Sequence, residues 1–267
     1  MSMDISQNDR EVSEVDVALC RAALYRALAL GFRPPAEETI ACLGSKEGVA
    51  ALEQAGAILD GIFGSNLTAS IQALGDSPAD LEELSSSYRR LFGHTASSFL
   101  PAYETEYGSG DLFQQPHDLS DLAGFYQAFG LMLDPGEHER ADHVSCECEF
   151  LSFLALKEAY ARTRDDSAML EETLKAARLF LKDHLGRFVP AFAKRLTRES
   201  HDRFYSRLAA ICHHFVIHDC GRLRVHTGPE NLNLRPVDDE RAPMACGGGK
   251  ECIAMPGFCG PEEMEDK

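Results

Sequence analysis

Apolar residues recur every three or four positions over most of this chain, the spacing that places them on one face of a helix. Val17, Cys20, Leu24 and Leu28 share one such face. The same pattern recurs within residues 81–91, 119–129, 170–181 and 204–215. Alternation of apolar and polar residues, which would indicate strands, is almost absent. The sequence therefore predicts an all-α fold.

The segment 142–162 differs from the others because its apolar residues, such as Val144 and Phe150, lie on more than one side of the expected helix. A helix of this kind is surrounded by other helices, so we expect it at the centre of the fold. Glu147 and Glu149 are two positions apart and would point about 200° away from each other, so they cannot act on one substrate as an acid and base pair. We expect one of them to face inward.

Helix boundaries can be predicted at two further places. Asp142 and His143 stand where the central helix should begin, and Asp142 is the expected cap because its oxygens can accept from free backbone amides. His143 then has a plain structural interpretation, as a histidine held by a neighbouring carboxylate. Pro190 should end or kink a helix near Arg187, since proline lacks the amide that a helix interior needs.

The chain changes character near Thr227, where it becomes rich in Gly, Pro and Cys and loses its helical periodicity. Such composition is typical of a loosely ordered extension. We therefore predict two parts, an all-helical domain over residues 1–226 and an irregular C-terminal extension over residues 227–267.

The charge balance limits the possible partners. Among 267 residues, 26 Lys and Arg face 43 Asp and Glu, so the formal net charge is −17. Nucleic acid is not an expected partner, because phosphate binding needs a basic surface, whereas a basic peptide suits an acidic protein. No run of 18 apolar residues occurs, and residues 1–17 lack the basic and apolar regions of a signal peptide. We expect a cytoplasmic protein without stable membrane insertion.

Nine cysteines, an odd and scattered number, indicate reduced thiols rather than a disulfide framework. Cys246, Cys252 and Cys259 are separated by five and six residues, without the closer pair that zinc and iron–sulfur sites usually include. The leading interpretation is a tail with free thiols, no metal and no cofactor. The alternative is an accessory redox subunit whose metal or iron–sulfur site is built from these three cysteines.

Residues 88–108 gather aromatic and acidic side chains around an expected turn. Within residues 88–93 and 100–108, four rings, including Tyr88 and Phe92, accompany the carboxylates of Glu104 and Glu106. Such a set suits an apolar peptide with a basic flank. An equally good interpretation is that Tyr88, Leu91 and Phe92 are core residues at helical spacing. No motif for catalysis is found, so no catalytic residue is predicted.

The stretch from Tyr88 to Ala161 resembles the TorD/DmsD/NarJ family of redox-enzyme maturation chaperones. The resemblance rests on a YxxLF segment from Tyr88, a PxYExxY segment from Pro101, the string LAGFYQAFGL from Leu122, an ExxDH motif from Glu139, and the ExEF…LxxKEA helix that follows. The family's usual Gly-Pro turn after the YxxLF segment is replaced here by residues 93–95.

This resemblance implies a TorD-like helical bundle that is not an enzyme. It implies binding to the apo catalytic subunit of a molybdopterin oxidoreductase, often with its twin-arginine signal peptide, until the cofactor is inserted. By position, Asp142 and His143 match the family's signature pair. The candidate client-binding and signal-peptide-binding residues are Tyr88, Leu91, Phe92, Pro101, Tyr103, Glu104, Tyr107, Glu139, Asp142 and His143.

Recognition of two arginines requires carboxylates beside an apolar surface, because a guanidinium forms a planar, two-point pair with a carboxylate. Glu104, Glu106 and Asp142 are therefore the expected arginine contacts. A helical scaffold without any molybdoenzyme client remains a further interpretation of the same pattern.

Overall fold

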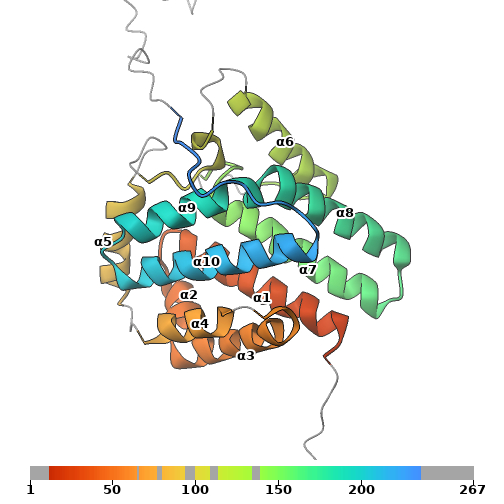
Figure 1. Cartoon of the computed structure of the whole chain (residues 1–267), viewed down its shortest axis with the longest axis horizontal. Helices are drawn as coiled ribbons and strands as arrows, with labels where there is room; N and C mark the ends of the chain where they lie inside the picture. Colours follow the sequence, from red (N-terminus) through yellow and green to blue (C-terminus); the bar gives the residue numbers. More distant parts are fainter. Residues whose placement is uncertain are drawn as a thin grey trace, which may run out of the picture. The chain divides into compact units, whose positions relative to one another are not determined.

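The computed structural model describes residues 12–235 apart from residues 65, 77–79, 94–99, 109–113 and 134–138. Within these residues the chain is all-α, as predicted, and its extended pairs are limited to two isolated bridges, Tyr103 with His143 and Tyr107 with Leu234 (Figure 1). The helices are α1 (Glu14–Phe32), α2 (Glu37–Thr39), α3 (Lys46–Phe63), α4 (Leu67–Gly75), α5 (Leu81–Phe92), α6 (Gln114–Ala128), α7 (Val144–Thr163), α8 (Ser167–Asp183), α9 (Leu185–Glu199) and α10 (Arg203–Arg222), with a π-helical turn at Ile40–Gly44 and a 3-10 turn at Glu104–Glu106.

Helix α7 has the central place that its apolar pattern predicts. It packs along α1 and also against α8 and α9. Helices α1 and α7 run in opposite directions, because Arg21 near the start of α1 pairs with Glu158 and Arg33 at its end pairs with Glu149. Glu147 is fully buried while Glu149 is partly exposed, so one carboxylate of this pair faces inward, as expected.

A buried ion network joins α1, α7 and α10. The guanidinium of Arg21 donates to both oxygens of Asp219, at 2.7 and 3.0 Å, and to Glu158 at 2.7 Å. The Tyr25 hydroxyl donates to Asp219 at 2.7 Å. All four side chains are buried, so the network fixes the relative positions of three helices that are far apart in the sequence.

The expectation that Pro190 ends a helix near Arg187 is wrong, because α9 begins at Leu185 and passes through Pro190, and a kink there stays a prediction. The missing proline amide would have bonded to the carbonyl of Gly186, four residues earlier. That carbonyl instead accepts from the amide of Gly228 at 2.9 Å. A Cβ on Gly228 would lie 1.9 Å from the carbonyl oxygen of Arg187, so only glycine allows this approach.

The segment after α10 runs from this contact toward the turn at 104–106. The Gly108 amide donates to the carbonyl of Asn233 at 2.9 Å, and the Arg235 amide donates to the carbonyl of Glu106 at 2.8 Å. By its internal contacts the chain divides between Arg235 and Pro236. Cys246, Cys252 and Cys259, on which the alternative metal or iron–sulfur site depends, lie outside the described residues.

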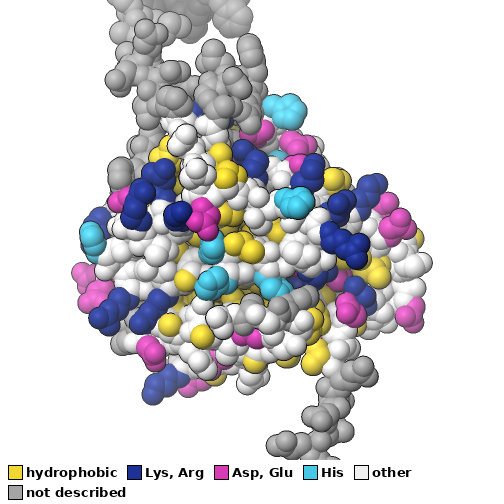
Figure 2. Space-filling view, viewed as in Figure 1, with side chains coloured by type: hydrophobic (Ala, Val, Ile, Leu, Met, Phe, Trp, Pro, Cys, Tyr) yellow, Lys and Arg dark blue, Asp and Glu magenta, His cyan; other side chains and the backbone are white. Residues whose placement is uncertain are grey.

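Two surface properties bear on the expected partners. No helix in the described part of the chain is both long and apolar enough to cross a membrane. On the face shown in Figure 2, Lys and Arg side chains are interspersed with Asp and Glu instead of forming a continuous basic stripe.

Candidate functional site

Most of the ten candidate client-binding residues lie in the interior. Eight of them are buried, and Tyr103 and Glu139 are partly exposed. The buried eight are Tyr88, Leu91, Phe92, Pro101, Glu104, Tyr107, Asp142 and His143. That these residues contact a client stays a prediction. In the structure they make contacts within the fold.

The aromatic members pack against α9 and α10. The ring of Tyr88 lies 5.0 Å from that of Phe92, which lies 5.6 Å from that of Tyr205. Tyr107 packs 5.5 Å from Phe188 and donates its hydroxyl to the carbonyl of Pro101 at 2.9 Å. This arrangement agrees with the interpretation of the YxxLF residues as core at helical spacing.

Glu104 is held by the chain's own cationic side chains. Its carboxylate is 0% exposed and accepts from Nε and Nη2 of Arg187 and from Nδ1 of His184, the last at 3.0 Å. The other ring nitrogen of His184 lies 3.2 Å from Asp121. Burial alone would lower the pKa of His184, but the hydrogen bond and charge of Glu104, together with Asp121, outweigh it and raise the pKa.

We expect this histidine to make stability depend on pH. Because its folded pKa lies above the unfolded value of about 6.5, His184 stabilises the fold fully below about pH 6.5, and this stabilisation is lost as pH rises through the raised pKa. The difference in free energy of unfolding between the wild type and His184→Gln, measured in urea from pH 5.5 to 9, should therefore shrink with rising pH. A difference that grew with pH would contradict the ion pair with Glu104.

Asp142 does not cap α7, contrary to expectation. His143 is the N-cap, and its Nδ1 accepts from the Ser145 amide at 3.2 Å. Because burial outweighs the attraction of Asp142 and lowers the pKa of His143 to about 4, the ring is neutral at pH 7 and can accept. Asp142 instead accepts from the amide and hydroxyl of Thr105 and from the guanidinium of Arg140.

Glu147 lies beside the buried carboxylates of Glu104 and Asp142. Both of its oxygens are buried without a hydrogen-bond partner among the described residues. Burial and then the charges of Glu104 and Asp142 raise its pKa well above the usual range. This environment favours the neutral carboxyl of Glu147, which can share its hydrogen with Glu104.

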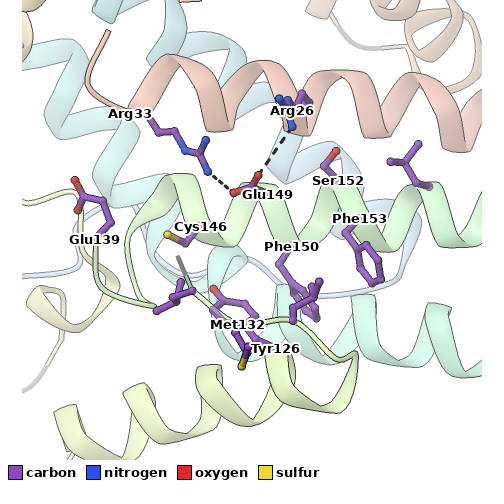
Figure 3. A pocket seen from close by; sticks show the side chains of 13 residues that line it. Arg26, Arg33, Tyr126, Met132, Glu139, Cys146, Glu149, Phe150, Ser152 and Phe153 are labelled. Atoms are coloured by element: carbon purple, nitrogen blue, oxygen red, sulfur yellow. Dashed lines mark hydrogen bonds and ion pairs between the residues drawn. The ribbon is translucent and has the colours of Figure 1, made fainter. Parts of the chain in front are cut away.

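An open groove of about 490 Å³ lies between α1 and α7 on one side and residues 131–133 on the other (Figure 3). It is lined by Arg26, Arg33, Tyr126, Leu131, Met132, Leu133, Glu139, Cys146, Glu149, Phe150, Ser152, Phe153 and Leu156. Met132 is 90% exposed and Leu156 is 50% exposed. Exposed apolar side chains around a hollow of this size are typical of a binding surface.

Charged side chains line part of the groove. Arg33 pairs with Glu149, which also lies 3.9 Å from Arg26 (Figure 3). Glu139 is the one predicted site residue that lines the groove, and it accepts from the Tyr103 hydroxyl at 2.8 Å. The apolar run from Leu131 to Leu133, just beyond the glycine that follows α6, was not singled out from the sequence, although it is the signal that could have located this surface.

Metal binding receives no support from the part of the chain that the structure describes. No group of three or more His, Cys, Asp or Glu there is placed to hold a metal ion. The six cysteines within it are free thiols.

Comparisons of the sequence with known proteins identify relatives of this chain. Residues 59–194, about half of the chain, match the family model described as nitrate reductase delta subunit. Over 229 residues the chain is 27% identical to the perchlorate reductase assembly chaperone protein of Dechloromonas aromatica, covering 80% of this chain and 94% of the relative.

Two further relatives match over shorter stretches. The selenate reductase assembly chaperone protein of Thauera selenatis is 38% identical over 89 residues, which are 33% of this chain and 44% of the relative. The chaperone protein TorD of Vibrio cholerae is 32% identical over 92 residues, which are 34% of this chain and 40% of the relative. These two matches therefore span less than half of each relative's length.

Proposed function

Because the chain belongs to the nitrate reductase delta subunit family, we propose that it is an assembly chaperone and not an enzyme. Its client is the apo catalytic subunit of a molybdopterin oxidoreductase, which it holds in the cytoplasm until the cofactor is inserted. Relatives named as reductase assembly chaperones and as TorD support this role, and they bear out the predicted resemblance to maturation chaperones.

The open apolar groove between α1, α7 and residues 131–133 is the observation that carries the proposal. An unfinished client exposes apolar segments that are buried in the finished enzyme, and a groove lined by Leu133, Phe153 and Leu156 provides a complementary surface. Its volume lies in the range of pockets that bind small ligands, which gives room for a few side chains. The groove therefore fits a short apolar segment.

A twin-arginine signal peptide is the segment of the client that best fits this surface. Its apolar run would occupy the groove, and its two arginines would lie toward Glu139, which lines the groove. The net charge of −17 favours such a basic partner and disfavours nucleic acid. The alternative of an accessory redox subunit depends on cysteines outside the described residues, and no observation favours it.

Leu156→Asp should reduce affinity for the client at least about tenfold, since loss of one buried leucine contact is worth about 1.5–3 kcal/mol. The side chain is half exposed in the free protein, so the substitution should leave the fold intact. The measurement is isothermal titration calorimetry with a synthetic peptide of two arginines followed by an apolar run, supported by co-purification with a candidate catalytic subunit.

Leu179→Asp is the matched control. Leu179 lies on α8, is 37% exposed and does not line the groove, so this substitution should leave affinity unchanged. Equal effects of the two substitutions, or unchanged binding by Leu156→Asp, would place the client elsewhere on the chain.

A further inference from the structure

The buried carboxylate of Asp142 already holds a guanidinium in a well-formed pocket. Arg140 donates from Nε to one oxygen at 3.0 Å and from Nη2 to the other at 2.7 Å. The same Nη2 donates to the Thr105 hydroxyl at 2.6 Å, and the guanidinium lies 4.7 Å from the centre of the Tyr103 ring. A planar two-point pair and an aromatic face are the chemistry of an arginine receptor.

The receptor and its occupant differ in how firmly they are held. Asp142 is 0% exposed, and its carbonyl accepts from the Glu104 amide at 2.8 Å, so its backbone is fixed against the 3-10 turn. The side chain of Arg140 is 32% exposed and belongs to a residue outside any helix. The pocket is therefore built into the fold, while the arginine reaches it from the surface.

This pocket adjoins the apolar groove. Glu139 lines the groove and accepts from the Tyr103 hydroxyl at 2.8 Å, and the Tyr103 ring is the one against which Arg140 lies. A chain segment seated in the groove could therefore place a neighbouring side chain at Asp142. Glu106, 3.6 Å from Arg140, adds a second carboxylate on the same side.

We propose that Asp142, Thr105 and Tyr103 form an exchangeable arginine site, filled by Arg140 in the free protein and by an arginine of the bound client in the complex. This inference rests on the proposed function and assigns one client side chain to one pocket. A buried carboxylate left unpaired is strongly destabilising, so the free protein needs an occupant of its own.

Exchange of one guanidinium for another keeps Asp142 paired in both states. Apolar contacts in the adjoining groove then decide which arginine occupies the pocket. A lysine cannot replace the client's arginine, because an ammonium is a point charge and makes no planar two-point pair. The site therefore selects arginine over lysine.

Removal of the internal competitor tests the site. Arg140→Ala should bind a peptide of two arginines and an apolar run at least about tenfold more tightly than the wild type in calorimetry. The same peptide with both arginines replaced by lysine should show no such gain. Should Arg140→Ala fail to fold, Arg140→Lys replaces it. A smaller gain in affinity is then expected, because the lysine still competes for Asp142, although more weakly than arginine.

Arg162→Ala is the matched control for the peptide measurement. Arg162 holds the buried Glu158 through Nε and Nη2, at 3.1 and 3.0 Å, from the far end of α7, and its side chain is 22% exposed. Its loss should leave peptide affinity unchanged. If the wild type binds the peptide but Arg140→Ala binds it no more tightly, the exchange is overturned while the proposed function stands.

A second measurement needs no client. Ethylguanidinium at millimolar concentration should raise the melting temperature of Arg140→Ala, and should do so neither for the wild type nor for Arg140→Ala combined with Asp142→Asn. Ethylammonium should have no comparable effect. If ethylguanidinium does not raise the melting temperature of Arg140→Ala, the proposed arginine site is overturned. If no variant binds the peptide, peptide binding under the proposed function fails, and the rescue alone then supports or overturns the guanidinium pocket.

Discussion

Arg21→Ala is expected to lower the free energy of unfolding by about 3–5 kcal/mol, the usual effect of removing one partner from a buried ion pair. The side chains of Asp219 and Glu158 are only 1% and 4% exposed, so water cannot replace the lost guanidinium. Arg222 and Arg162 would remain on the outer side of the two carboxylates. Urea unfolding followed by circular dichroism measures the loss.

The stability lost in Arg21→Ala should also depend on pH. Burial by itself would raise the pKa of Asp219, but the charges of Arg21 and Arg222 and their hydrogen bonds hold it well below the usual value. A depressed folded pKa gives stability that is fully present above the unfolded pKa of about 3.9 and is lost as pH falls through the folded value. The effect of Arg21→Ala should therefore be full at pH 7 and smaller in acid.

Arg26→Ala on the same helix is the control. Arg26 pairs with Glu38 at 2.9 Å, but the two side chains are 50% and 61% exposed, so removal should cost at most about 1 kcal/mol. A loss from Arg26→Ala equal to that from Arg21→Ala would show that burial does not set the strength of these pairs.

The helices of this fold could be predicted because their burial repeats along the sequence. The apolar positions of 17–28, 81–91, 170–181 and 204–215 lie within α1, α5, α8 and α10. Helix α7 could be placed at the centre because Val144, Phe150 and Leu151 cover more than one of its sides, and all three are buried. Periodicity reports burial directly, so it was sufficient for these helices, whereas α3, α4 and α9 were not identified from it.

Pairing between distant residues could not be predicted in the same way. Arg21 and Asp219 are 198 positions apart, and Glu104 and Arg187 are 83 apart. Charged residues carry no periodic signal of which partner they meet, so Glu104 and Asp142 looked equally suited to an external arginine. The Gly228 amide that satisfies the helix around Pro190 was hidden for the same reason.

The groove was only partly predictable, because its wall depends on how α6 is attached. The string LAGFYQAFGL supplies Phe125, Tyr126 and Phe129, whose rings all contact Phe150 on α7. The sequence marks these residues as apolar, but it does not show that they converge on one ring. That convergence sets the position of residues 131–133, and hence the groove.

Phe150→Ala should lower the free energy of unfolding by about 3–5 kcal/mol, as expected for a large buried ring replaced by a methyl group. Phe150 is 2% exposed, and its ring centre lies 4.7 Å from that of Phe180 and 5.1 Å from that of Tyr126. The rings of Phe125 and Tyr126 on α6, and of Phe129 just after it, rest on Phe150. Relative to the wild type, the substitution should therefore speed hydrogen exchange of the α6 amides more than that of the α10 amides. Urea unfolding and hydrogen exchange measure the two effects.

Phe215→Ala is the control that separates a general loss of stability from a loss of the packing that holds α6. Phe215 on α10 is 0% exposed and packs 4.6 Å from Tyr25, so its replacement should destabilise the fold by a similar amount without selective exchange in α6. Binding of an apolar peptide should fall further in Phe150→Ala than in Phe215→Ala, because only Phe150 lines the groove. If α6 remained protected in Phe150→Ala, its position would depend instead on polar contacts such as that between Asp121 and His184.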